Sequence, residues 1–197
     1  TLALTAGAHA EGKFTQANGE DSHAEGYVSS ANGYYSHSEG NATYASGYSS
    51  HAEGFATQAI GPDSHAEGQY TISSGDASHA EGFYAHSLGT YSHAEGDSTI
   101  SSGESSHAEG QGSQSNGLAS HAEGSSIANG SIAHAEGTVT SAIGNSSHSE
   151  GTYTIASGDN QHVQGKYNIA DTTSAFILGN GTSVTAQSNA MTVDWSG

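Results

Sequence analysis

The residues of this chain that could do chemistry are histidines and glutamates that recur in the phrase SHAEG, as at Ser22 to Gly26 and Ser50 to Gly54. The histidines of this phrase stand 14 residues apart, except for one step of 13 residues between His121 and His134. Imidazoles and carboxylates can transfer protons, hold a divalent metal ion or form charge-assisted hydrogen bonds with each other. Catalysis needs one such site rather than many copies, so the repetition favours a structural role.

Known catalytic patterns do not fit these residues. The phrase HAE lacks the HExxH spacing of zinc hydrolases, and the chain has no cysteine to accompany HxE as in zinc deaminases. Ser22 and His23 cannot act as nucleophile and base, since neighbouring strand residues point to opposite faces. The glycines match neither GxGxxG nor a phosphate-binding loop. We therefore predict no catalytic residue and no enzymatic activity.

Composition narrows the class of protein further. The 197 residues include 28 glycines and a single proline, and large aliphatic residues are too few for an ordinary hydrophobic core. Twenty acidic residues against only Lys13 and Lys166 give a formal charge of −18, which disfavours binding to nucleic acid and to anionic membranes. No apolar run is long enough to span a bilayer and no signal-peptide pattern is present, so we expect no membrane insertion.

Short strands and tight turns must position the histidines and glutamates. Glycines recur every seven residues, and each ends a five-residue phrase of the form SxAxG, so the 14-residue unit consists of two half-repeats. Period two inside the phrase indicates a strand, with positions one and three on one side and two and four on the other. The glycine supplies the backbone freedom for the turn. The predicted turn glycines begin with Gly12, Gly19, Gly26, Gly33, Gly40 and Gly47.

Two short strands and two corners make one 14-residue coil, and similar coils stack by parallel strand pairing. The predicted fold is an all-β parallel β-roll, or β-solenoid, with Ser, Ala and Thr of positions one and three in its interior. Residues 1–165 carry the regular repeats. In residues 166–197 Thr172 replaces a glycine and apolar residues increase, which predicts degenerate last coils that form a cap or a neck toward a further C-terminal region.

The two outer faces of the coil differ. The SHAEG half repeats His and Glu at its outward positions with little change, whereas the other half varies, as at Gln16 and Asn18 or Tyr44 and Ser46. A thin roll buries little apolar surface, so partner copies are expected to cover one flank. A constant face suits packing against identical copies, and a varied face suits solvent or a ligand.

The phrase SxAxG in 14-residue pairs resembles the YadA-like head repeats of trimeric autotransporter adhesins, whose motif reads close to SVAIG. This resemblance implies a left-handed parallel β-roll, assembly as a homotrimer, and a motif strand whose two x residues face the trimer axis. The segment AFILG, Ala175 to Gly179, stands in register with the motif strands. The resemblance thus predicts an interface ladder of His9, Glu11, His23, Glu25, His37, Glu39, His51, Glu53, His65, Glu67, His79, Glu81, His93, Glu95, His107, Glu109, His121, Glu123, His134, Glu136, His148, Glu150, His162, Phe176 and Leu178.

The SHAEG wording and the closing stretches NIADTTSAFILGNG and SNAMTVDWSG also look like repeats in tail-fibre or appendage proteins of phages and prophages of Gram-positive hosts. This resemblance implies a trimeric structural or adhesive segment of a phage tail fibre or surface fibre that presents a host-binding surface. The expected location is the virion, or the cell surface and extracellular space. The expected partners are further copies of the chain and a carbohydrate or protein of the host surface.

Two roles remain open for the His and Glu stripe. Stacked ionised glutamates would repel one another, so the first role is a ladder in which histidines donate hydrogen bonds to the glutamates. Carboxylate neighbours are then expected to raise the histidine pKa values, which would make the protein most stable at mildly acid pH. The alternative role is binding of a divalent metal ion or an anion on the trimer axis, with His23, His51 and His79 as candidate ligands. No other cofactor is predicted.

Aromatic residues gather at the predicted corners, among them Tyr27, Tyr34, Tyr35, Tyr48, Phe55, Tyr70, Phe83, Tyr84 and Tyr91. Exposed tyrosines on a rigid scaffold are typical of carbohydrate or protein contacts. The same side chains could instead pack across the crevices between rolls. Polysaccharide hydrolysis, a third function for a fibre, needs paired acids in a wide groove that a narrow coil does not offer.

Overall fold

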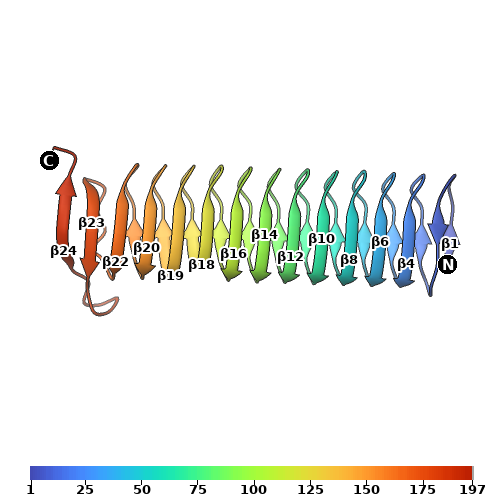
Figure 1. The fold of residues 1–197 in the computed structure, drawn as a ribbon, viewed down its shortest axis with the longest axis horizontal. Helices are drawn as coiled ribbons and strands as arrows, with labels where there is room; N and C mark the ends of the chain where they lie inside the picture. Colours follow the sequence, from blue (N-terminus) through green and yellow to red (C-terminus); the bar gives the residue numbers. More distant parts are fainter. Residues whose placement is uncertain (197) are drawn as a thin grey trace. The chain divides into compact units, whose positions relative to one another are not determined.

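The computed structural model describes residues 1–196 and divides the chain into two compact units, Thr1–Thr99 and Ile100–Gly197. Gly197, the last residue of the predicted segment 166–197, lies outside the described residues. Each unit is a parallel β-solenoid in which longer strands alternate with short ones (Figure 1), and no helix occurs among residues 1–196. The prediction of an all-β parallel solenoid with two short strands in each 14-residue coil is confirmed.

In the first unit the longer strands carry the SHAEG phrase and the short strands carry the second half-repeat. The longer strands are β4 (His23–Tyr27), β6 (His37–Asn41), β8 (His51–Phe55), β10 (His65–Gln69), β12 (His79–Phe83) and β14 (His93–Asp97), and the equivalent strand of the first coil, β2 (His9–Ala10), has two residues. The short strands are β1 (Leu2–Ala3), β3 (Gln16–Ala17), β5 (Ser30–Ala31), β7 (Tyr44–Ala45), β9 (Gln58–Ala59), β11 (Ile72–Ser73) and β13 (His86–Ser87).

The second unit continues the alternation up to its last strands. Its strands are β15 (Ile100–Ser101), β16 (His107–Gln111), β17 (Gln114–Ser115), β18 (His121–Ala128), β19 (His134–Ala142), β20 (His148–Thr152), β21 (Ile155–Ala156), β22 (His162–Lys166), β23 (Ser174–Asn180) and β24 (Asn189–Asp194). Strand β24 pairs antiparallel with β23, and Figure 1 shows these two strands in red running in opposite directions. Parallel stacking of coils therefore ends at β23.

Neighbouring coils pair in register, so that each residue stacks on its equivalent one coil later. Strand β4 pairs with β6 through His23↔His37 and Glu25↔Glu39, and in the second unit β16 pairs with β18 through His107↔His121. The ladder hydrogen bonds are regular, as in the bond of 2.9 Å from the His23 amide to the Ser36 carbonyl. Each repeat position thus forms a column, and on the SHAEG strands the outward columns hold like residues, whereas on the short strands they do not, as at Tyr44↔Gln58.

The interior of the roll admits only small side chains. Ser22 and Ala24 of the first half-repeat and Ser29 and Ala31 of the second are at most 1% exposed, as positions one and three of the phrase predict. The serine hydroxyl also has a structural role, because Ser22 Oγ donates a hydrogen bond of 2.6 Å to the carbonyl of Gly19. The same bond recurs in later coils and satisfies a buried backbone carbonyl at the corner.

The glycines of the two half-repeats share close approach to the next coil, but only those of the SHAEG phrase have positive φ. Gly26, which ends a SHAEG phrase, has φ +102°, a conformation that favours glycine. Gly47, which ends a second half-repeat, does not have positive φ, but a Cβ there would lie 1.9 Å from the carbonyl oxygen of Gly61 in the next coil. The SHAEG glycines therefore combine positive φ with close approach, since a Cβ at Gly26 would lie 2.1 Å from the carbonyl oxygen of Gly40, whereas close approach alone explains the second set.

Two amide side chains end the columns of small residues in the second unit. Gln161 is buried where other coils hold serine, and its Nε2 donates to the carbonyls of Asp171 and Ser174. Asn168 is fully buried, and its side chain both accepts from the Ile155 amide and donates to the Ile155 carbonyl. Each side-chain amide thus forms hydrogen bonds with backbone groups that have no backbone partner where the regular coils end.

The coil with the 13-residue step is accommodated at a corner. Strands β18 and β19 keep His121↔His134 and Glu123↔Glu136 in register, and the irregularity falls between Ser125 and Ile127. The missing residue therefore leaves the histidine and glutamate columns aligned. Among residues 1–196, no helix is long and apolar enough to cross a bilayer.

We predict that Gly103→Ala destabilises the protein far more than Gly112→Ala. A Cβ at Gly103 would lie 2.0 Å from the carbonyl oxygen of Gly117, whereas a Cβ at Gly112 meets nothing within 4 Å. The expected loss for Gly103→Ala is about 3 kcal/mol or more from forced backbone movement. The loss for Gly112→Ala is expected to be about 1–2 kcal/mol, from its positive φ.

Thermal unfolding followed by far-ultraviolet circular dichroism measures both effects. Gly112→Ala is a matched control, because Ala42 and Ala56 already occupy the equivalent corner position with φ of 58° and 55°. Equal losses in the two variants would contradict the close-approach explanation.

Candidate functional site: the histidine and glutamate face

In each unit the outward side chains of the SHAEG strands form what we call the His–Glu face, defined by the motif histidines and glutamates from His9 to Glu95 in the first unit and from His107 to His162 in the second. In-register pairing stacks the imidazoles at the strand spacing. The rings of His51 and His65 lie 4.8 Å apart at an interplanar angle of 2°, and those of His107 and His121 lie 4.9 Å apart at 2°. The side chains are about one-third exposed in the isolated chain, as for His65 at 34%. The face is therefore a flat, half-exposed surface of imidazoles beside carboxylates.

Most glutamates contact the histidine of the following coil. The Nε2 atom of His65 lies 3.3 Å from Oε1 of Glu53, and Nε2 of His121 lies 3.1 Å from Oε1 of Glu109. Comparable pairs, at 3.3 to 3.5 Å, are Glu67 with His79, Glu81 with His93, Glu136 with His148 and Glu150 with His162. Near the start of the first unit the contacts lie within one strand, at 3.8 Å for His23 with Glu25 and for His37 with Glu39.

His51 stands where the pairing changes from within a strand to between coils. Glu39 contacts His37 and Glu53 contacts His65, so no hydrogen-bond partner for the buried Nε2 of His51 is found among residues 1–196. Burial lowers the pKa of His51 from its ordinary value of 6.5, and the neighbouring imidazoles His65 and His37 lower it further. The nearby carboxylates oppose this shift without reversing it.

A second break lies at the coil with the missing residue. A hydrogen bond to the Glu136 carboxyl raises the pKa of Glu123, and burial and the Glu136 charge add to the shift. The pKa of His134 is lowered by burial and then by His121 and His148. At both breaks the expectation that carboxylates raise the histidine pKa is wrong, because desolvation and like-charged neighbours outweigh the attraction.

In regular layers the glutamate pKa responds to its neighbours. Burial acts to raise the pKa of the Glu67 carboxyl, but hydrogen bonding with Glu81 and the nearby His65 and His79 outweigh it and lower the pKa. Glu150 behaves in the same way, with burial opposed by Glu136 and His162. A hydrogen bond with a neighbouring carboxyl group and the adjacent imidazoles thus together favour the ionised form of Glu67 and Glu150.

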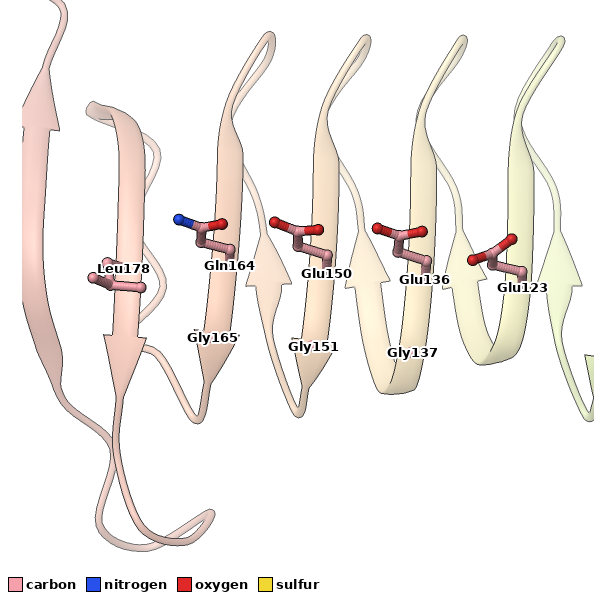
Figure 2. Close-up of a pocket in the computed structure, with 8 residues that line it drawn as sticks. All are labelled: Glu123, Glu136, Gly137, Glu150, Gly151, Gln164, Gly165 and Leu178. Atoms are coloured by element: carbon pink, nitrogen blue, oxygen red, sulfur yellow. The ribbon is translucent and has the colours of Figure 1, made fainter.

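A groove runs beside the glutamates in each unit. In the first unit it has a volume of about 480 Å³ and is lined by Glu11, Gly12, Glu25, Gly26, Glu39, Gly40, Glu53 and Gly54. In the second unit it has a volume of about 600 Å³, and Figure 2 shows Glu123, Glu136, Glu150, Gln164 and Leu178 in one row on successive strands. Glycines leave the floor of each groove without side chains, so another chain could approach the backbone closely there.

The predicted ladder residues fall in continuous columns within each unit. His9 stacks on His23 with ring centroids 4.9 Å apart, and Phe176 packs edge-on against His162 at 5.5 Å. Leu178 pairs in register with Gln164 and lines the groove. That these residues face a trimer axis stays a prediction.

The three histidines named as metal candidates occupy different settings. His79 lies in a pair with Glu67, His23 lies near Glu25 of its own strand, and His51 stands at the break in pairing. Groups of metal-ligating atoms within 4.8 Å of one another include His51, Glu53 and His65, as well as His107, Glu109 and His121. The sequence pattern could not indicate that the ligand pairs join adjacent coils.

This arrangement defines a parallel β-solenoid repeat protein in which each unit has a constant ionisable face. Within it, residues 135–160 match the family model of the YadA head domain repeat in two copies. The resemblance to YadA-like head repeats is therefore confirmed for that segment. No curated protein matches the chain.

We predict that the protein loses stability as the pH falls from 8 to 5.5. A histidine whose folded-state pKa lies below its unfolded value of 6.5 contributes stability that is complete above 6.5 and is lost as the pH falls toward the folded-state pKa. His51 and His134 act in this direction, whereas the raised pKa of Glu123 acts in the opposite one.

Melting temperatures at pH 8 and pH 5.5 of the wild type and of the double variant His51→Gln, His134→Gln isolate the histidine effect. The melting temperature should decrease more between pH 8 and pH 5.5 for the wild type than for the double variant. A wild type that is more stable at pH 5.5 would contradict the lowered pKa values.

Proposed function

We propose that this chain is a non-enzymatic segment of a homotrimeric fibre, either a phage tail fibre or a surface adhesin, that presents a host-binding surface. In the proposed trimer the His–Glu faces of three chains pack together along the axis. The observation that carries this proposal is the glycine-floored groove beside a face of constant side chains. The match of residues 135–160 to YadA head repeats supports the same assembly.

The energetics of the roll support self-association. Its buried apolar side chains are almost all alanines, with Val163 and Ile177 as larger exceptions in the second unit. Burying an alanine methyl contributes much less than burying a leucine, so one chain gains little from its interior. Packing three copies through a shared face would add the missing buried surface. The proposed fibre segment is thus made rigid by the stacking of coils within one chain and by the association of three chains.

Aromatic residues at the two corners are proposed to serve different purposes. Phe55, Tyr70, Phe83 and Tyr84 follow the glycines that end the SHAEG strands, and their rings contact one another at 4.5 to 6.2 Å. These rings lie at the groove end of the strand, where a neighbouring copy would cover them. By contrast, the tyrosines of the other corner, Tyr34, Tyr35 and Tyr48, are more than half exposed.

We infer that the second set of tyrosines contributes to a contact with carbohydrate or protein of the host surface. Tyr35 and Tyr48 form an edge-to-face pair with ring centroids 5.4 Å apart. Rigid aromatic side chains offer large contact area at low entropic cost. The acidic charge of the chain disfavours anionic partners such as nucleic acid. The proposed location is accordingly the virion, or the cell surface and extracellular space.

Light scattering tests the trimer with two tryptophan variants. Glu67→Trp places a bulky side chain on the His–Glu face, whereas Gln58→Trp places the same side chain on the outward side of the short strand β9. We expect a trimer for the wild type and for Gln58→Trp, and loss of the trimer for Glu67→Trp because its face must pack closely.

Circular dichroism of both variants establishes that the strands are intact. A wild-type monomer, or a Glu67→Trp variant that remains trimeric with unchanged stability, would show that the His–Glu face is not the interface.

Adhesion is tested by substituting Tyr34, Tyr35 and Tyr48 together with alanine. Binding of the trimer to a glycan array and to isolated Gram-positive cell walls should fall at least severalfold, since three exposed rings are removed from the proposed contact. The control is Leu118→Ala, which removes a corner side chain that is 49% exposed but not aromatic. Unchanged binding of the triple variant would exclude this corner as the contact surface.

A further inference from the structure

The paired layers of the His–Glu face hold an imidazole nitrogen and a carboxylate oxygen at a particular separation. Six pairs between adjacent coils have Nε2 to Oε1 distances of 3.1 to 3.5 Å. Charge-assisted hydrogen bonds between nitrogen and oxygen are shorter, at about 2.7–2.9 Å. Two ligands of a zinc-sized ion with bonds of about 2.1 Å stand about 3.0–3.4 Å apart, a range that includes five of the six pairs.

Stacking limits what one chain can contribute to an ion. The rings of His65 and His79 are parallel and lie 4.8 Å apart. Two nitrogens bound to one ion can be at most about 4.2 Å apart, so stacked imidazoles do not share an ion. Each layer of one chain therefore supplies one nitrogen and one oxygen, and a complete coordination shell needs ligands from elsewhere.

Charge supplies an independent argument. The chain has 20 acidic residues and only two lysines or arginines. In the proposed trimer the glutamate columns of three chains would lose water, and ionised carboxylates without counter-charge are costly to bury. Bound cations would neutralise the columns.

We propose that the paired layers bind divalent first-row transition-metal ions, with one carboxylate oxygen and one imidazole nitrogen from each of three chains. This inference rests on the proposed trimer, because one chain provides two ligands for each layer. Three copies provide three nitrogens and three oxygens, the number that a six-coordinate ion takes. A mixed set of imidazole and carboxylate ligands suits ions such as Zn²⁺, Co²⁺ and Ni²⁺.

Zn²⁺ is the probe for the test, with protein first stripped by a chelator. Calorimetric titration at pH 7.5 and metal analysis after dialysis count the ions bound to each trimer. The variant Glu53→Gln, Glu67→Gln, Glu81→Gln keeps side-chain size and removes three carboxylates of the paired layers. We expect the wild type to bind several ions and this variant to lose one ion for each substituted layer.

The control variant is Glu20→Gln, Asp63→Asn, Asp76→Asn, which removes the same charge from exposed corner acids of the first unit. It should bind as many ions as the wild type. Equal losses in both variants would mean that Zn²⁺ follows net charge rather than the paired layers, and would overturn the inference.

Light scattering on the same samples separates the two proposals. A trimer that binds no Zn²⁺ overturns the metal site and leaves the proposed fibre assembly in place. A chain that stays monomeric with and without Zn²⁺ overturns both. A trimer that forms only with Zn²⁺ supports both and assigns the ions a role in assembly.

Discussion

The close approach of one coil to the next is the constraint on which the rest of this structure depends. Stacked backbones meet so tightly that a Cβ at Gly33 would lie 1.9 Å from the carbonyl oxygen of Gly47. This spacing fixes a parallel, in-register ladder, and the ladder in turn leaves an interior that alanine, serine and threonine fill. The core is small because the coil is narrow, and the coil is narrow because glycine ends each half-repeat.

The same register creates the His–Glu face and the repulsion between its like-charged side chains. Like side chains stack at the strand spacing, which brings imidazole onto imidazole and carboxylate beside carboxylate. Pairing Glu53 with His65 of the following coil relieves the repulsion, but each change in the pairing scheme leaves a group without its counterpart. His51 and Glu123 are those groups: burial and the neighbouring imidazoles lower the pKa of His51, whereas a hydrogen bond with Glu136 and burial raise the pKa of Glu123.

Much of the fold was predictable because its rules are local. Period two in SHAEG separates buried Ser22 and Ala24 from outward His23 and Glu25, and the 14-residue step gives the register. The pairing of Glu109 with His121 and the shifted pKa values were not predictable, since they depend on distances between coils and on burial. Nor does a sequence show that the Asn168 side chain replaces a backbone partner of Ile155. The contacts of Asn168 lie where the regular repeat ends, so no repeated pattern indicates them.

The corners are the part of this coil where the side chain can vary without a change in the backbone. Tyr35 and Val28 both have φ of 59°, a region that non-glycine residues adopt at a cost of about 1–2 kcal/mol. Residues as different as Asp63, Ala77 and Tyr91 adopt it at equivalent corners, so stacking dictates the backbone there whatever the side chain. The interior requires small residues and the His–Glu face keeps two residue types, whereas the corner accepts almost any side chain in a fixed position. A binding surface could therefore change at the corners without altering the coil.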